Sequence, residues 1–175
     1  MRNYLLTLVF FICGLVVNGQ TSVRLNIVLN HVQNLTVNPT QETTTLTYNT
    51  VEDYSKGVEV VQKEHLNVFS TGPFVVKVKV ANEDFVQIGA DVARRIHLPN
   101  VRVSAKAVEE TPGINTEQRL LGLDESSLIT GDNPIMNQKF DVTYRGPGNN
   151  ELILFSEMGK TNTFTNIVMY SIEAK

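Results

Sequence analysis

The amino-acid sequence predicts an all-β protein, an antiparallel β-sandwich of about seven to nine strands. Two observations lead to this fold class. Apolar and polar residues alternate with a period of two in several segments, and turn-forming residues separate these segments at short intervals. The chain has no long segment with a helical period and no internal repeat.

Three segments predict strands most directly. In residues 74–80, "FVVKVKV", every second residue is apolar, and two lysines stand between apolar positions. Residues 101–107, "VRVSAKA", and residues 140–144, "FDVTY", alternate in the same way. Because the side chains of a strand point to its two faces in turn, each segment is expected to bury one face and expose the other.

Further strands are expected where the alternation is weaker. These segments are residues 44–50, 58–61, 65–70, 151–155 and 163–172. Turn chemistry separates the strands, as at Asn38-Pro39, Gly72-Pro73 and "RGPGNN" (145–150). Residues 109–139 have no sustained period, and we expect a short strand or one helical turn near 119–123 to shorten this connection. The pattern as a whole predicts an immunoglobulin-like β-sandwich.

Residues 1–19 have the features of a cleaved secretory signal peptide. Arg2 supplies the early positive charge, and an apolar run extends from Tyr4 to Val17. The run is shorter than the roughly 20 residues of a membrane span. We expect cleavage after Gly19, which leaves residues 20–175 as one domain. The alternative is lipid attachment at Cys13, but the large Ile12 precedes that residue, where lipoprotein processing requires a small one.

The composition argues against several classes of function. Cys13 is the only cysteine and lies inside the expected leader, so the exported domain has no disulfide, thiolate nucleophile or cysteine metal ligand. The chain has 15 basic and 18 acidic residues and a net charge of −3, without a long basic block. This charge gives little electrostatic support for binding nucleic acid or an anionic membrane.

The sequence also singles out no catalytic group. It contains no G-x-S-x-G nucleophile elbow and no glycine-rich phosphate loop. The three histidines, His31, His65 and His97, are far apart in sequence and do not have the spacing of metal ligands. Acidic residues that could attract calcium lack the spacing of a calcium loop; they are Glu83, Asp84, Asp124, Glu125 and Asp132. We therefore expect no enzyme, no cofactor and no metal.

The first stretch after the leader, "SVRLNIVLNHVQNLTV" (22–37), raises a separate question. Its odd positions are apolar at Val23, Leu25, Ile27 and Leu29, and the apolar run then stops at His31. We expect residues 35–37 to belong to the protein's own sheet. Residues 23–29 are either the first strand of that sheet or a strand donated to a neighbouring subunit, with His31 as the joint.

Several segments together resemble a group of small exported β-sandwich proteins of Gram-negative bacteria. They are "LTYNTVEDYSKGV" (46–58), "HLNVFSTGPFVVKVKVAN" (65–82), "KFDVTYRG" (139–146) and "FTNIVMYSIEAK" (164–175). The group is similar to the pilin-like subunits that a chaperone and an usher assemble, whose last strand carries a near-terminal tyrosine after a glycine. Gly159 and Tyr170 occupy similar places here. The resemblance implies an adhesive or filament-forming role without catalysis.

Two functional hypotheses follow. The first is a non-enzymatic structural or surface subunit, pilin-like or adhesive, that is secreted to the periplasm or cell surface of a Gram-negative bacterium. Its partners would be other protein subunits, through self-association or assembly machinery, and it would bind no nucleic acid and have no integral membrane segment. The alternative is an extracellular glycan- or ligand-binding module whose site lies in residues 109–139.

Overall fold

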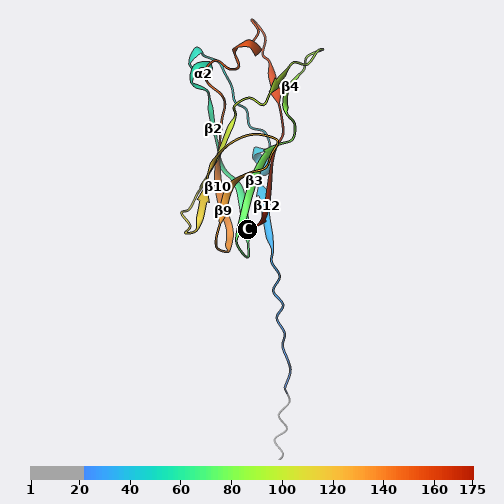
Figure 1. Ribbon diagram of the computed structural model, residues 1–175, viewed down its shortest axis with the longest axis vertical. Helices are drawn as coiled ribbons and strands as arrows, with labels where there is room; N and C mark the ends of the chain where they lie inside the picture. Colours follow the sequence, from blue (N-terminus) through green and yellow to red (C-terminus); the bar gives the residue numbers. More distant parts are fainter. Residues whose placement is uncertain (1–21) are drawn as a thin grey trace, which may run out of the picture. The chain divides into compact units, whose positions relative to one another are not determined.

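The computed structural model describes residues 22–175, which fall into two units (Figure 1). The first unit ends at Asn30, and the second is a compact unit from His31 to Lys175. Residues 22–30 have no assigned helix or strand, and all their side chains are exposed. The expected signal peptide, residues 1–19, lies outside the described residues.

The compact unit is built from antiparallel sheets. The first sheet has five strands, in the order β1 (Gln33–Val37), β2 (Glu59–Ser70), β10 (Ile135–Arg145), β6 (Arg102–Ala107) and β8 (Gln118–Leu120). The second has four strands, in the order β12 (Val168–Ala174), β3 (Phe74–Val80), β9 (Ser126–Gly131) and β7 (Ile114–Thr116). A three-stranded sheet contains β11 (Thr163–Thr165), β4 (Asp84–Ile88) and β5 (Arg95–His97). Three short helices complete the unit: η1 (Pro39–Gln41), α2 (Val51–Lys56) and η2 (Ile153–Phe155).

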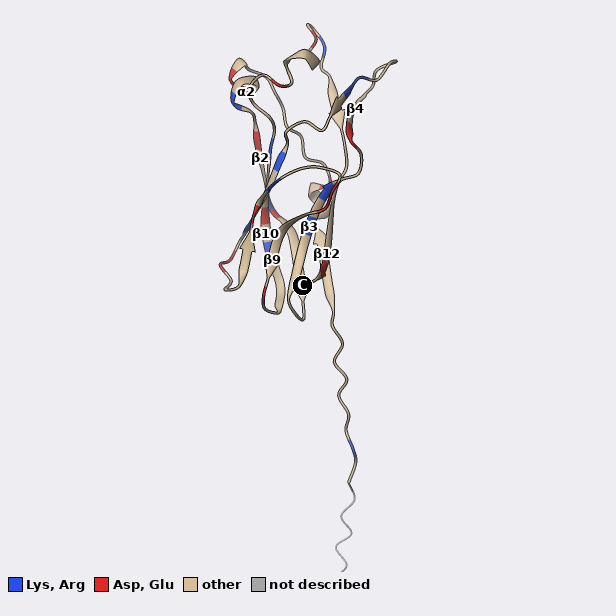
Figure 2. Cartoon of the chain, in the orientation of Figure 1, with Lys and Arg blue, Asp and Glu red and all other residues tan. Residues whose placement is uncertain are grey.

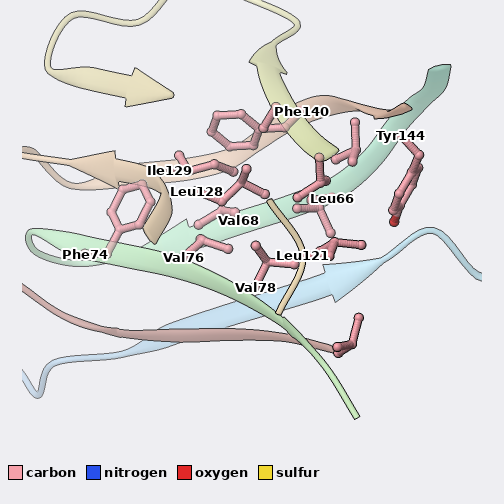
Figure 3. Close-up of a cluster of buried hydrophobic side chains, with 14 of the residues drawn as sticks. Leu66, Val68, Phe74, Val76, Val78, Leu121, Leu128, Ile129, Phe140 and Tyr144 are labelled. Atoms are coloured by element: carbon pink, nitrogen blue, oxygen red, sulfur yellow. The ribbon is translucent and has the colours of Figure 1, made fainter. Parts of the chain in front are cut away.

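The five-stranded and four-stranded sheets share one apolar core, which gives the protein a sandwich-like character. Strand β3 contributes its four alternating apolar residues, all buried, while its two lysines are partly exposed. Side chains of β2 and β10 meet them, among them Leu66, Val68 and Phe140 (Figure 3). The alternation buries one face of each sheet because successive side chains of a strand point to opposite sides.

Strands β1 and β12 lie next to each other at one margin of the two main sheets. Each is the outer strand of its own sheet, so β1 pairs with β2 and β12 pairs with β3. The β1 ladder ends where Val37 faces Leu66, and the chain then leaves the sheet through η1. Strand β2 continues beyond Leu66 to Glu59 with β10 as its ladder partner.

The three strands predicted from the clearest alternation are confirmed. Residues 74–80 form β3, residues 102–107 form β6, and residues 140–144 lie inside β10. Two expected strands, 58–61 and 65–70, are parts of the single long strand β2. The expected strand 163–172 is divided into β11 and β12. Residues 109–139 contain β7, β8 and β9, and β8 is the short strand expected near 119–123.

Two predicted strands were wrong. Residues 151–155 contain the helical turn η2, because Asn149 and Asn150 adopt left-handed backbone angles (φ 52° and 58°) and reverse the chain immediately before it. Residues 44–50 join no sheet. The helix α2 was also missed, although Thr50 and Asp53 form a capping box at its start, in which the side chain of each residue accepts a hydrogen bond from the other's backbone N–H.

Candidate functional site

The four apolar residues that the sequence indicates as a possible donated strand are strongly exposed. Val23, Leu25, Ile27 and Leu29 are between 77% and 93% exposed, and no strand pairing of the described chain includes them. Residues 22–30 contain a single charged residue, Arg24 (Figure 2). An exposed segment with alternating apolar side chains, whose backbone polar groups lie outside any ladder, has the features of an interaction element.

A surface groove lies next to the Val37 end of the β1 ladder. It consists of two adjoining hollows of about 360 and 620 Å³, which share lining residues that include Leu46, Phe85, Val101 and Phe164. The smaller hollow, called the lower hollow below, has Val37 in its lining. One wall consists of residues 43–48, and the other of residues 161–168.

The wall at residues 43–48 has the alternating side-chain pattern of a strand, but its backbone is not part of a β-ladder. Thr44, Leu46 and Tyr48 are half-buried, and the residues between them are exposed. Side chains hold this wall in place: Gln62 Nε2 donates to Thr44 Oγ1 at 3.1 Å, and Tyr48 Oη donates to the carbonyl of Pro147 at 2.9 Å. Burial is the largest cause that raises the pKa of Tyr48 to about 12, and the negative charge of Glu151 is the second. This hydroxyl therefore remains a donor at neutral pH.

The opposite wall leads from β11 into β12. Asn166 anchors its middle, because Asn166 Nδ2 donates to the carbonyl of Asn82 at 2.7 Å. Next to this anchor, Ile167 is exposed, whereas Val168 and Tyr170 pack against the core. Gly159 lies outside β12, in the turn between Glu157 and Lys160, where its φ of 73° suits a glycine. Of the two residues assigned to a pilin-like last strand, the structure therefore places Tyr170 in the strand and Gly159 before it.

A chain of hydrogen bonds crosses the floor of the lower hollow. His65 Nδ1 lies 2.9 Å from Gln41 Oε1, and His65 Nε2 lies 3.1 Å from Tyr144 Oη. The Tyr144 and Tyr170 hydroxyl oxygens are 2.7 Å apart. Burial lowers the pKa of His65 and raises the pKa values of both tyrosines, so all three side chains are uncharged at neutral pH.

Three of the five candidate acidic residues form ion pairs. Asp84 pairs with Arg95 and His97, Glu125 with Lys79, and Asp132 with Lys175. His31 lies against Gly72, at the turn between β2 and β3. Across residues 22–175, no group of three or more His, Cys, Asp or Glu side chains is arranged to hold a metal ion. The segment 109–139, the expected site of a glycan-binding module, contributes only Leu121 to the two hollows.

The groove offers apolar surface and backbone hydrogen-bonding groups, and this combination suits an added strand. Sequence reasoning named the exposed segment but missed the groove, because the walls come from residues more than a hundred positions apart. The missed residues include Gln41, Phe85 and Phe164. The strand-like alternation of residues 44–48 was the one available signal for a wall of the groove.

No helix within residues 22–175 is long and apolar enough to cross a membrane, α2 being six residues long. The chain matches no protein-family model, and a search of curated proteins finds no match to it either.

Proposed function

We propose that the protein is an exported, non-enzymatic structural subunit with an immunoglobulin-like sandwich, pilin-like in its assembly, in the periplasm or on the surface of a Gram-negative bacterium. Residues 23–29 of one copy would enter the groove of the next copy as an added strand. One observation carries the proposal: the chain contains both an exposed apolar segment and an open groove with an unladdered wall. The expected leader at residues 1–19 and the resemblance of the strands to exported sandwich proteins support the location.

The length of the segment at residues 23–29 is similar to the length of the groove wall at residues 43–48. An extended strand rises about 3.3 Å per residue, so residues 23–29 span roughly 20 Å, similar to a wall that runs from residue 43 to residue 48. With one face turned inward, the alternating apolar side chains would meet groove residues such as Leu46, Phe85 and Phe164. The backbone of the added strand would supply the partners that residues 43–48 lack in a ladder.

Backbone pairing is needed in addition to side-chain burial. Each aliphatic side chain contributes about 1.5–3 kcal/mol when it is fully buried. Association costs about 4–15 kcal/mol in lost freedom of motion, so one or two anchors, which contribute about 1.5–6 kcal/mol, reach only the lower end of this cost. Four anchors together with a new hydrogen-bonded ladder exceed the lower part of that range.

Chain length favours a second copy as the source of the strand. The backbone of Val32 is tied to Thr71, with Thr71 N donating to Val32 O at 3.0 Å, at the end of β1 away from the groove. A segment that turned back at this point would use about five residues alongside β1 before it reached the groove at Val37. Most of the apolar residues in 23–29 would then lie beside β1 and not against the wall at residues 43–48.

The test compares two neighbouring substitutions in the exported full chain. Ile27→Asp places a charge on the apolar face of the segment, and Val28→Asp places the same charge on the opposite face. Both side chains are exposed in the single copy, at 77% and 80%, so neither change should lower the melting temperature of the monomer.

Sedimentation velocity measures the outcome. We expect the natural chain and Val28→Asp to form concentration-dependent oligomers, and Ile27→Asp to remain monomeric. A natural chain that stays monomeric at every concentration, or an Ile27→Asp variant that assembles as well as the natural chain, would contradict the proposal.

A further inference from the structure

The hydrogen-bond chain on the groove floor connects the two sides of the groove. Gln41 follows β1 on one side, and Tyr170 belongs to β12 on the other. His65 and Tyr144, between them, are both buried, with His65 only 3% exposed. The three contacts of 2.9, 3.1 and 2.7 Å therefore run from η1, which precedes the wall at residues 43–48, to β12, which begins at the end of the wall at residues 161–168.

The neighbouring bonds fix the direction of every proton in this chain. Gln41 Nε2 donates to the carbonyl of Lys63 at 2.8 Å, so Gln41 Oε1 is free to accept from His65 Nδ1–H. His65 Nε2 then has a lone pair and accepts from the Tyr144 hydroxyl. The Tyr144 oxygen in turn accepts from the Tyr170 hydroxyl. Each donor has an acceptor only while His65 is neutral.

If His65 were protonated, the hydrogen bonds from Gln41 to Tyr170 would include one more donor than acceptors. His65 Nε2–H would donate to the Tyr144 oxygen, and Tyr144 would have to turn its own hydrogen towards Tyr170. The hydroxyl hydrogen of Tyr170 would then need a new acceptor in the hollow. Water can supply that acceptor while the groove is open, but an apolar strand seated over the hollow would remove it.

The charged side chains around His65 do not stabilise the protonated form of its ring. Tyr144 of β10 and Tyr170 of β12 face the ring as neutral hydroxyls, and the neighbouring Lys63 and Glu64 of β2 are paired with Asp141 and Lys139 of β10. From the η1 side, Gln41 is neutral and Glu42 is exposed at the rim of the lower hollow. No salt bridge of residues 22–175 includes His65 or Glu42.

We propose that His65 makes strand capture sensitive to acid: the groove holds a strand of a second copy at neutral pH and releases it when His65 is protonated. This inference rests on the proposed function, because it describes the regulation of the same groove. Burial lowers the pKa of the ring already in the open groove, and a seated strand lowers it further. Since the assembled form then binds fewer protons than the free form, assembly weakens as the pH falls.

Sedimentation velocity of the exported full chain at two pH values tests the inference. We expect assembly to be at least about fivefold weaker near pH 5 than near pH 7.5. His65→Gln keeps an acceptor for Tyr144 and cannot take up a proton, so it should assemble with little pH dependence. His97→Gln is the matched control, since His97 is exposed and paired with Asp84 outside the groove, and it should keep the full acid response.

The outcomes separate the two proposals. If the natural chain fails to assemble at both pH values, the strand-donation function is wrong and the acid response falls with it. If the natural chain assembles equally well at both, or His65→Gln keeps the acid response, only the role of His65 is overturned. Should His65→Gln misfold, NMR titration of the natural chain decides: the His65 ring should titrate at lower pH in the assembled form than in Ile27→Asp, and equal titration overturns the inference.

Discussion

The hydroxyl oxygens of Tyr144 and Tyr170 lie 2.7 Å apart and join β10 of the five-stranded sheet to β12 of the four-stranded sheet. Between β8 and β9, Arg119 Nε donates to the carbonyl of Ser127 at 2.7 Å, and in the core the two sheets meet through apolar side chains, as Figure 3 shows. The hydrogen bond between Tyr144 and Tyr170 therefore fixes the position of one sheet edge against the other at the floor of the groove. Its loss should affect both the stability of the unit and the shape of the groove.

Replacing the two tyrosines should have unequal effects. Tyr144→Phe leaves both His65 Nε2 and the Tyr170 hydroxyl without a partner, whereas Tyr170→Phe removes only the last donor of the chain. We expect Tyr144→Phe to lower the free energy of unfolding by about 1–3 kcal/mol, and Tyr170→Phe by about 0.5–1.5 kcal/mol. Urea denaturation measures both values, and a larger loss for Tyr170→Phe would contradict the assigned direction of the hydrogen bonds.

A glycine in β9 is required by a neighbouring aromatic ring. A Cβ atom at Gly131 would overlap the ring of Phe74, which is fully buried and lies opposite Gly131 in the ladder. Gly131→Ala should therefore destabilise the protein by about 1–3 kcal/mol through overpacking. Gly122→Ala is the control, because nothing lies within 4 Å of a Cβ built there, and its melting temperature should stay close to that of the natural chain.

The capping box of α2 predicts a dependence on pH. The backbone N–H groups of Asn49 and Thr50 donate to Asp53 Oδ2 at 2.8 Å each, and these bonds lower the pKa of the Asp53 carboxyl. The stabilisation is therefore present above the ordinary aspartate pKa of about 3.9 and is lost as the pH falls through the lower value of the folded protein.

Asp53→Asn should consequently melt at a lower temperature than the natural chain at neutral pH, and the difference should narrow in strong acid. Glu52→Gln is the matched control, since it removes an exposed ion pair with Lys56 and should change the melting temperature little at neutral pH. A difference between Asp53→Asn and the natural chain that stays constant from neutral pH to about pH 2 would disprove the role of the Asp53 carboxylate.

Hydrogen exchange should report directly on the unladdered wall. In the monomeric Ile27→Asp variant, the backbone amides of residues 43–48 should exchange quickly, while those of β3 remain protected. In assembled natural chain, the same wall amides should become protected because an added strand pairs with them. Equal exchange of residues 43–48 in the two samples would contradict strand addition at this wall.

Much of the fold was predictable because it depends on local alternation. Residues 74–80 have an uninterrupted period of two, and such a strand can bury only one face wherever it lies in the sheet. The same rule failed at residues 151–155, where the left-handed asparagines before them decide the backbone direction. The local pattern does not show whether a partner strand is present. Residues 44–50 were therefore predicted as a strand, although they form no ladder.

Of the candidate site, only the exposed segment at residues 23–29 was predictable from the sequence. Val23, Leu25, Ile27 and Leu29 are neighbours in sequence, and their alternation is visible without a structure. The floor of the groove brings His65 together with Tyr144, which is 79 positions away. A contact of this kind depends on the pairing of β2 with β10, and nothing in the sequence around His65 distinguishes it from a histidine in any other partly polar strand.

The anchoring of Val32 to Thr71, at the end of β1 away from the groove, has a consequence for the symmetry of an assembly. Under the proposed donation, the giving and the receiving surfaces are different parts of the subunit, so the contact is heterologous unless two copies exchange their segments reciprocally. Repetition of such a contact produces an open polymer with two unlike ends unless its rotation closes a ring. One end would carry a free segment and the other an empty groove, and growth at the two ends would follow different rates.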